Sequence, residues 1–344
     1  GSQGVFLADL IDIVPGQAQD RCVSHPDPIF NVHGITTRRT TGRNTPSAIN
    51  AVFNVRNFWD GRASFLFNGV DPVGPRDPAA RVLQVQANGA VVPVAITIDH
   101  GSAASQAVGP PGNGVEMSCG GRTFPKIGKK LLSLTPLGKQ VVEPTDSMLG
   151  PVAKSRVTQG ATGLQVSYAD MIRAAFDPRW WSSNKVVTFS GGVPTVGNPT
   201  SSSLTTNQYT VMEANFSLFF GLAIQMYEST LIANDTPFDQ YQEGRTSALT
   251  AQQLEGIGIF MNQGACSACH TGATFSGATV ENIGVEPFPN PPVPEGLVER
   301  MQMQLDVALS SFAFTRPAVG QPVIMPLTFE PRGALVEIRQ GTAA

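Results

Sequence analysis

The sequence has 344 residues, of which 41% are hydrophobic and only 14% are charged, and its formal net charge is −3. A chain of this length exceeds what one hydrophobic core usually supports, so we expect two domains. Its 23 basic and 26 acidic residues form no block of like charge, which argues against nucleic acid as a partner.

Turns are predicted along much of the chain, because 35 glycines and 27 prolines free or restrict the backbone at many positions. In chain order, the run that begins Thr45-Pro46 favours a short helix or turn. Further short helices are predicted at about residues 123–133 and 166–176. The β-branched runs Val91 to Ile98 and Val186 to Val196 favour hairpins.

The longest predicted helix covers about Asn207 to Ile232, whose apolar residues occupy most sides and therefore indicate a buried helix. Its polar interruptions make it unsuitable as a membrane span. Thr250 and Gln253 have the spacing of a capping box, which predicts a second helix that ends at Gly264. A last helix is predicted at Met301 to Leu309.

The run Cys266-Ser267-Ala268-Cys269-His270 has the C-x-x-C-H spacing of a haem c attachment site. Two thiols three positions apart reach the two vinyl groups of one haem, and the adjacent histidine then supplies an axial iron ligand. A zinc site would need two more ligands, and the sequence has neither a second cysteine pair nor an H-x₃₋₅-H run. A thioredoxin-like pair would not require the histidine. We therefore expect one covalent haem c on Cys266 and Cys269, with His270 bound to its iron.

The haem motif also predicts the compartment. Haem c is assembled outside the cytoplasm, so the protein is expected to be periplasmic or extracellular. In such an oxidising compartment the two remaining cysteines, Cys22 and Cys119, could form a disulfide. Two buried free thiols are the alternative, and the sequence does not decide between them.

Several runs between residues 42 and 285 follow one another in the order found in a known family. They are Gly42 to Ser47, Asn50 to Phe53, Phe58 to Ala63, Gln106 to Pro110, Glu116-Met117, Met212 to Phe216, Leu249 to Gln253, Phe275, and Asn282 to Val285. Together they resemble the bacterial dihaem cytochrome c peroxidases and the related enzyme MauG. The resemblance implies a mostly α fold with two cytochrome-c-like haem domains, long loops and a few short hairpins.

On this basis we divide the chain in two. Residues 1–205 are expected to form the peroxidatic-side domain, which contains Trp59 and Glu116 but lacks its own C-x-x-C-H motif. Residues 206–344 are expected to form the cytochrome-c-like domain that carries haem c. In each domain the porphyrin would supply much of the apolar core.

The resemblance also implies roles for three residues. It makes Trp59 a candidate electron relay between two haems, against the alternative of a core aromatic residue. It makes Glu116 the candidate distal acid that moves a proton between peroxide oxygens, against the alternative of a solvated loop carboxylate. Asn44 matches a family residue that helps to hold an interdomain calcium ion through oxygen. His33 lies in the region where some relatives place a distal histidine.

The sequence departs from the family pattern in its haem count. The family has two C-x-x-C-H motifs, whereas this sequence has one, and the run Cys22-Val23-Ser24-His25 has a single cysteine. Three explanations for the single motif stay open: the chain is a fragment of a longer protein, it is a natural monohaem relative, or part of the chain is missing from the sequence. The second axial ligand of the haem iron is equally open, with Met301, Met303 and Met325 as candidates.

The first functional hypothesis is a peroxidase-type oxidoreductase. It would reduce hydrogen peroxide with electrons that a small redox protein delivers through haem c and Trp59, and a second haem is expected in the full protein. One alternative is a c-type cytochrome that only transfers electrons. Another is a MauG-like oxidation of a protein or another organic substrate. A calcium ion and a homodimer are further expectations, whereas nucleic acid and a membrane-spanning segment are not expected.

Overall fold

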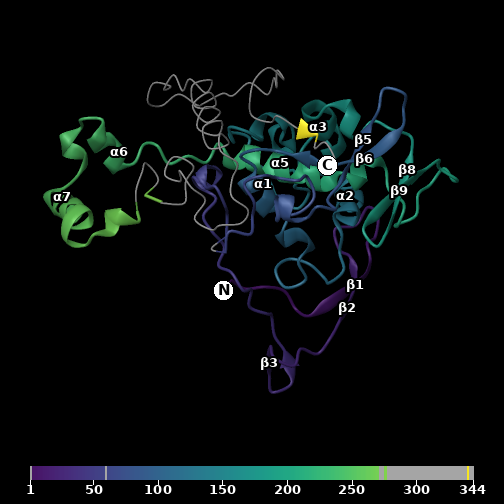
Figure 1. The fold of residues 1–344 in the computed structure, drawn as a ribbon, viewed down its shortest axis with the longest axis horizontal. Helices are drawn as coiled ribbons and strands as arrows, with labels where there is room; N and C mark the ends of the chain where they lie inside the picture. The colour runs from purple at the N-terminus through teal and green to yellow at the C-terminus, as the bar shows by residue number, and fades with distance from the viewer. Residues whose placement is uncertain (1, 59, 271–274, 277–338, 341–344) are drawn as a thin grey trace.

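The computed structural model describes residues 2–58, 60–270, 275–276 and 339–340 (Figure 1). Of these residues, 31% are helical and 17% are in strands or bridges. The expectation of a mostly α fold is therefore wrong, whereas the division into two haem domains at residue 205 stays a prediction. Glycine and proline account for much of the difference, because prolines begin short 3₁₀ turns such as Gly74–Arg76 and Pro110–Gly112, and twelve described glycines have positive φ.

The described strands are short and form five two-stranded antiparallel sheets. β1 (Ala8–Asp12) pairs with β2 (Arg21–Ser24), β3 (Asn31–Val32) with β4 (Ile35–Thr36), β5 (Val82–Val85) with β6 (Val91–Val94), β7 (Ile96–Thr97) with β10 (Arg339–Gln340), and β8 (Val186–Ser190) with β9 (Val193–Gly197). The hairpin predicted at Val186 to Val196 is confirmed. The run Val91 to Ile98 contains β6 and β7, which do not pair with each other. Instead, β6 forms an antiparallel pair with the preceding strand β5.

The helices are also short. They are α1 (Ser102–Ala107), α2 (Phe124–Leu132), α3 (Tyr168–Ala175), α4 (Val211–Ala214), α5 (Phe216–Glu228), α6 (Pro237–Gln242) and α7 (Ala251–Gly258). The two helices predicted at about 123–133 and 166–176 are confirmed as α2 and α3. The run that begins Thr45-Pro46 is a turn, followed by a 3₁₀ turn at Ala51–Phe53. The helix predicted at Met301 to Leu309 lies outside the described residues.

The predicted long helix from Asn207 to Ile232 is divided at Asn215, which ends α4 and precedes α5. The buried Asn215 side chain accepts a hydrogen bond from Leu83 N at 2.8 Å and donates to Leu83 O at 2.7 Å and to Trp180 O at 2.8 Å. These bonds tie the start of α5 to β5 and to the 3₁₀ turn that contains Trp180. The break in the helix therefore serves contacts with distant segments.

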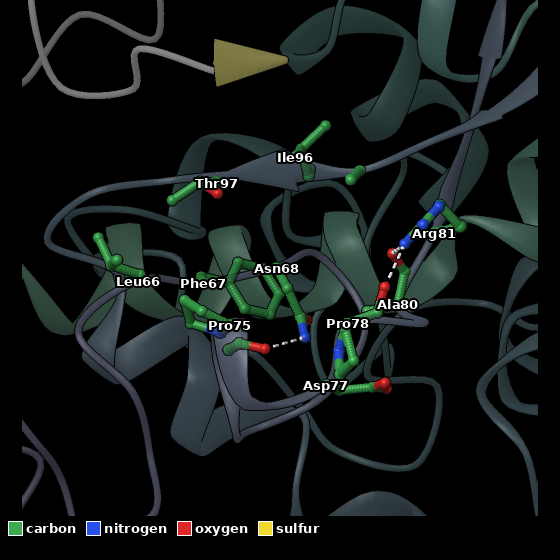
Figure 2. A pocket seen from close by; sticks show the side chains of 12 residues that line it. Leu66, Phe67, Asn68, Pro75, Asp77, Pro78, Ala80, Arg81, Ile96 and Thr97 are labelled. Atoms are coloured by element: carbon green, nitrogen blue, oxygen red, sulfur yellow. Dashed lines mark hydrogen bonds between the residues drawn. The ribbon is translucent and has the colours of Figure 1, made fainter. Parts of the chain in front are cut away.

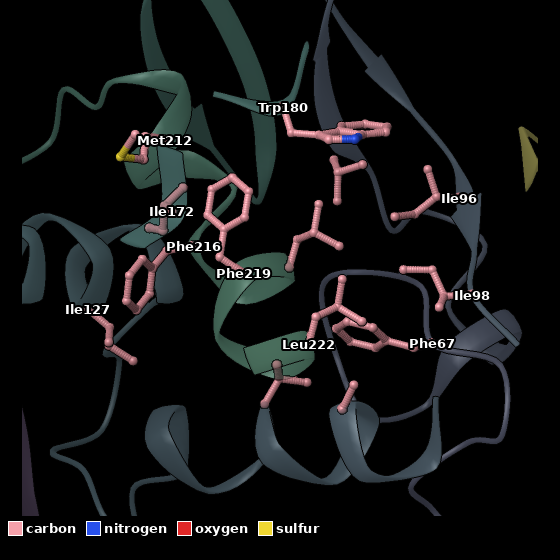
Figure 3. Packing of buried hydrophobic residues seen from close by; sticks show 14 residues of the cluster. Phe67, Ile96, Ile98, Ile127, Ile172, Trp180, Met212, Phe216, Phe219 and Leu222 are labelled. Carbon is pink, nitrogen blue, oxygen red and sulfur yellow. The ribbon is translucent and has the colours of Figure 1, made fainter. Parts of the chain in front are cut away.

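The main hydrophobic core surrounds α5, with Phe216, Leu218 and Phe219 buried among side chains of α1, α2, α3 and β7 (Figure 3). Helices α1 and α5 approach closely at Gly221, where a Cβ atom would lie 3.1 Å from the main-chain oxygen of Ala104 in α1. The helices thus pack through a residue that has no side chain. Among the described residues, no helix is long and apolar enough to cross a bilayer.

The segment from Leu231 to His270 differs from this core. Figure 1 shows α6 and α7 apart from the body that α1 to α5 form. None of its residues is buried, although it contains several large apolar side chains. This segment therefore has no closed hydrophobic core of its own.

Candidate functional site

The candidate haem attachment motif, Cys266 to His270, follows α7 after one further helical turn. Thr250 caps α7 and makes the predicted capping box with Gln253, and a wider helical turn then runs over Ile259–Gln263 and ends at Gly264, as predicted. Cys266 to Ala268 form a 3₁₀ turn, in which Cys266 O accepts hydrogen bonds from Cys269 N at 3.2 Å and His270 N at 2.9 Å. This turn brings both thiols and the histidine into one short segment, and both cysteines are free and exposed.

The imidazole of His270 is oriented by a backbone carbonyl. Its Nδ1 atom lies 3.0 Å from Phe275 O. A carbonyl can only accept a hydrogen bond, so this contact places the ring proton on Nδ1 and leaves the Nε2 lone pair for a metal. The arrangement is the one that an iron-binding histidine requires.

Apolar side chains around the motif are open to solvent. Ile259, Met261 and Phe275 are 47%, 57% and 40% exposed. Phe275 also packs edge-on against Phe238 and Phe260, at centroid distances of 5.1 and 5.7 Å. Such a cluster without a core needs an apolar cover, and a porphyrin attached to two adjacent thiols would supply one. The residues therefore fit haem c, while Met301, Met303 and Met325 lie outside the described residues.

The second candidate site is the loop that carries Glu116. Asn113 organises this loop, because its Oδ1 atom accepts hydrogen bonds from Val115 N at 2.9 Å and Glu116 N at 3.1 Å. Its main-chain oxygen also accepts from Met117 N and Ser118 N. The position of Glu116 is thus fixed by the fold of its own loop.

The Glu116 carboxylate is turned into the protein and is only 13% exposed. Its Oε1 atom lies 3.4 Å from Arg62 Nη2. Its Oε2 atom is buried and has no hydrogen-bond partner among the described residues. A buried carboxylate oxygen without a partner is costly, and this is common where a group must remain free for a ligand.

Arg62 is held by a tight turn that begins at Phe58. Phe58 and Gly61 both have positive φ, and Gly61 N donates to Phe58 O at 3.0 Å. The Arg62 guanidinium lies 4.6 Å from the centroid of the Phe58 ring, a cation–π contact. Trp59, the candidate electron relay, lies outside the described residues. Its role stays a prediction.

Asp60 of the same turn pairs with Arg43, whose Nε donates to Asp60 Oδ2 at 3.0 Å. The hydrogen bond from Arg43 lowers the pKa of Asp60 below its ordinary value, and that of Arg43 is raised by the same contact. The sequence reasoning assigned no role to Arg62 or Arg43. Both lie inside runs that matched the family, but only the structure shows that Arg62 contacts Glu116.

Other predicted residues are not brought to Glu116 by any described contact. Asn44 is exposed, and the described residues contain no group of three or more His, Cys, Asp or Glu side chains that could hold a metal ion. His33 is exposed at the turn between β3 and β4, which lies at the outer end of the N-terminal arm in Figure 1. The calcium site at Asn44 stays a prediction.

Cys22 and Cys119 form a disulfide, with their Cα atoms 6.4 Å apart. The bond joins β2 to the loop at a point three residues after Glu116. The question that the sequence left open is thereby answered in favour of the disulfide.

A small cavity of about 130 Å³ has none of these site residues in its lining (Figure 2). Its wall includes Asn68, whose Nδ2 atom donates to Gly74 O at 3.0 Å, and the Asp77 side chain. Asp77 shares a hydrogen bond with the neighbouring Asp71. Burial and this contact raise the pKa of Asp71 from 3.8 to about 6.

Comparison with known proteins finds one matching family and several similar proteins. Residues 19–187 match the family model of di-haem cytochrome c peroxidases. The chain is 29% identical to cytochrome c551 peroxidase of Pseudomonas aeruginosa over 248 residues. The aligned residues are 72% of this chain and 42% of that protein. No solved structure matches the chain.

Two shorter matches are to proteins of the same kind. Cytochrome c peroxidase Ccp of Escherichia coli K12 is 41% identical over 64 residues, which are 19% of this chain and 14% of that protein. The methylamine utilization protein MauG of Methylorubrum extorquens is 30% identical over 64 residues, 19% of this chain and 18% of that protein. The chain thus spans less than half the length of the curated relatives described here. The comparisons thus show similarity of this chain to the bacterial dihaem cytochrome c peroxidases, which are oxidoreductases, and to MauG.

Proposed function

We propose that the chain acts as a dihaem-peroxidase-type oxidoreductase that reduces hydrogen peroxide. In this proposal Glu116 is the acid–base group, and Cys266, Cys269 and His270 hold haem c. The observation that carries the proposal is the state of the Glu116 carboxylate. One oxygen contacts Arg62, and the other is buried and has no partner among the described residues. The family match supports the same assignment.

Reduction of hydrogen peroxide to two molecules of water consumes two electrons and two protons. Haem c, when bound, supplies one-electron transfer. Glu116 Oε2 can accept the proton of one peroxide oxygen and return it to the other, which leaves as water when the O–O bond breaks. The two electrons and two further protons then convert the remaining oxygen to the second water. General acid–base help of this kind contributes about 10²- to 10⁴-fold in rate.

Arg62 would keep Glu116 ready for this task. The contact on Oε1 fixes the orientation of the carboxylate, so that Oε2 is the free oxygen. Stacking on Phe58 holds the guanidinium in turn.

The remaining assignments follow the family. Trp59 would relay electrons from haem c, a small redox protein would supply them, and the protein would work in the periplasm or outside the cell. Asn44 would contribute one oxygen to a calcium site. A homodimer and a second haem complete the proposal, although the sequence offers only one C-x-x-C-H attachment site.

That single attachment site favours a second candidate function, electron transfer without peroxide chemistry. The two functions differ in a simple experiment. Purified haem-loaded protein is analysed by pyridine haemochrome spectroscopy and intact mass for its haem count, and is then mixed with hydrogen peroxide and a reduced small c-type cytochrome. Peroxide-dependent oxidation of the donor supports the peroxidase. Electron exchange with the donor that is unaffected by peroxide overturns it in favour of the second candidate.

The haem assignment has its own control. A Cys266→Ala, Cys269→Ala variant should lose covalent haem, whereas Ser267→Ala between the two cysteines should keep it. Covalent haem in the double variant would overturn the attachment site.

A further inference from the structure

We propose that the Cys22–Cys119 disulfide positions Glu116, so that its reduction by a thiol lowers peroxide turnover while haem c stays attached. The inference rests on the proposed role of Glu116 and adds a means of regulation to it. It follows from the way in which the loop of residues 113–120 is attached to the protein.

The loop is held from outside mainly by the N-terminal segment, residues 2–40. Val5 N donates to Val115 O at 2.9 Å, and Arg39 Nη2 donates to Gly114 O at 3.3 Å. At the far end of the loop, Gly120 N donates to Ala8 O at 2.7 Å and Gly120 O accepts from Leu10 N at 2.9 Å. Contacts from this segment therefore flank Glu116 on both sides.

The N-terminal segment has little core of its own. Its buried residues are Gly4, Ala8, Ile13 and Asp27. Instead, it is tied to the body by charged pairs and by the disulfide. Asp20 pairs with Arg122 and with Lys130 at 2.8 Å, and Asp12 pairs with Lys126 at 2.7 Å.

The disulfide is the covalent tie in this arrangement, and it closes a sequence separation of 97 residues. Breaking the bond returns conformational freedom to both of the segments that it joins, and longer closed loops release more. One of these two segments contains Cys119, which is three residues after Glu116. Ion pairs at Asp12 and Asp20 would still hold β1 and β2 near α2. Among the described contacts at this end of the loop, however, only the two hydrogen bonds of Gly120 with β1 would remain, without a covalent bond beside them.

The chemistry of the switch is ordinary thiol–disulfide exchange. A dithiol reductant gives two electrons and two protons to the Cys22–Cys119 bond, which becomes two thiols, and the dithiol becomes a disulfide. Both cysteines are partly exposed, so a small reductant can reach them. The haem thioethers are carbon–sulfur bonds and do not exchange with thiols.

Turnover should respond because proton transfer depends on the position of the carboxylate. Misplacement of a catalytic group by about 1 Å costs up to about 10²-fold in rate. The contact between Glu116 Oε1 and Arg62 Nη2, at 3.4 Å, orients the carboxylate, whereas the main chain that carries Glu116 is placed by its loop, so a shift of the loop also moves the carboxylate. We expect loss of the disulfide to lower kcat about tenfold and to change KM for peroxide much less.

The test is a double-mutant cycle on the haem-loaded full chain. Cys22→Ser, Cys119→Ser is made in the wild-type and in the Glu116→Gln backgrounds, and kcat, KM and the thermal midpoint are measured. If the disulfide acts through Glu116, kcat falls about tenfold in the first background and by less than twofold in the second, while the midpoint falls equally in both. Equal losses of kcat in both backgrounds, or no loss in the first, would overturn the proposal.

A stability-matched control separates positioning from general destabilisation. Ile172→Ala truncates a buried side chain of α3, and its loss of stability should be comparable to that of the disulfide variant. Its kcat at a temperature well below unfolding should stay within twofold of the wild type. A tenfold loss in this control as well would mean that turnover follows stability, and would overturn the positioning role.

The chemical route repeats the test without a mutation. Wild-type protein is reduced with a dithiol, desalted without oxygen, assayed, reoxidised and assayed again. Turnover should fall and then recover, with the haem content constant throughout. Failure to recover with intact haem would contradict a reversible switch.

A separate readout distinguishes the two proposals. Hydrogen exchange at the Glu116 and Met117 amides needs no turnover, and it should be at least about tenfold faster in the disulfide-free variant. Wild-type protein without turnover but with this change would refute the proposed peroxidase function and leave the positioning intact. Unchanged exchange would refute the positioning.

Discussion

Arg62 Nη2 lies 3.4 Å from Glu116 Oε1, although the two residues are 54 positions apart in the sequence. Their side chains are 24% and 13% exposed. Arg62 reaches this position from a turn with two positive-φ residues, Phe58 and Gly61. The carboxylate therefore depends for its orientation on a side chain from a different part of the chain.

Replacement of Arg62 should impair turnover more than folding. Arg62→Gln removes the charge and the contact with Oε1, and we expect kcat to fall about tenfold to a hundredfold because the carboxylate loses its orientation. Arg62→Lys keeps the charge without the planar fork and should recover part of the loss. Steady-state kinetics with hydrogen peroxide measure both variants. Arg173→Gln, which breaks an exposed pair with Asp170, is the control and should be neutral.

The Asp71–Asp77 pair should make stability depend on pH. Because the pKa of Asp71 is about 6 in the folded protein and 3.8 ordinarily, the folded state binds more protons between these values. The free energy of unfolding should therefore gain a contribution that is fully present below about pH 4 and is lost as the pH rises through 6. Asp77→Asn removes the competing carboxyl, so it should flatten this slope. After allowance for solvent screening, we expect it to stabilise the protein by about 1 kcal/mol at pH 7.

Urea unfolding of both proteins at pH 5 and pH 7.5 measures this difference. The wild type should lose more stability than Asp77→Asn between the two pH values. Equal losses would contradict a contribution of Asp77 to the raised pKa of Asp71.

Asn215 should be the most sensitive polar residue of the core. Asn215→Ala leaves the main-chain groups of Leu83 and the oxygen of Trp180 without partners, and we expect a loss of about 3 kcal/mol in the free energy of unfolding. Asn198→Ala, which removes an exposed contact with Lys185, should cost less than about 0.5 kcal/mol. Chemical denaturation of the two variants provides the measurement, and equal effects would show that the buried bonds contribute little.

Local patterns in the sequence predicted local structure well. The capping box at Thr250 and Gln253 and the helices α2 and α3 depend on neighbours within a few residues, and they are found where expected. The long helix from Asn207 failed because Asn215 satisfies bonds with Leu83, 132 positions away, which no local pattern records. The mostly α expectation failed because it came from the family resemblance, whereas glycine and proline keep the elements of this chain short.

The site shows the same contrast. The C-x-x-C-H motif is contiguous, so the sequence alone identified Cys266, Cys269 and His270 as the candidate haem site. Glu116 came from the resemblance, but its pairing with Arg62 depends on how two distant turns fold. The disulfide stayed open for the same reason, since cysteines 97 positions apart can be joined only by the tertiary fold.

The central claim is that Glu116 carries the proton in peroxide reduction. Its most direct test compares kcat for hydrogen peroxide in wild-type and Glu116→Gln proteins of equal haem content. The amide keeps the size of the side chain but cannot exchange a proton, so kcat should fall about 10²- to 10⁴-fold. Equal kcat values in the two proteins would contradict the claim.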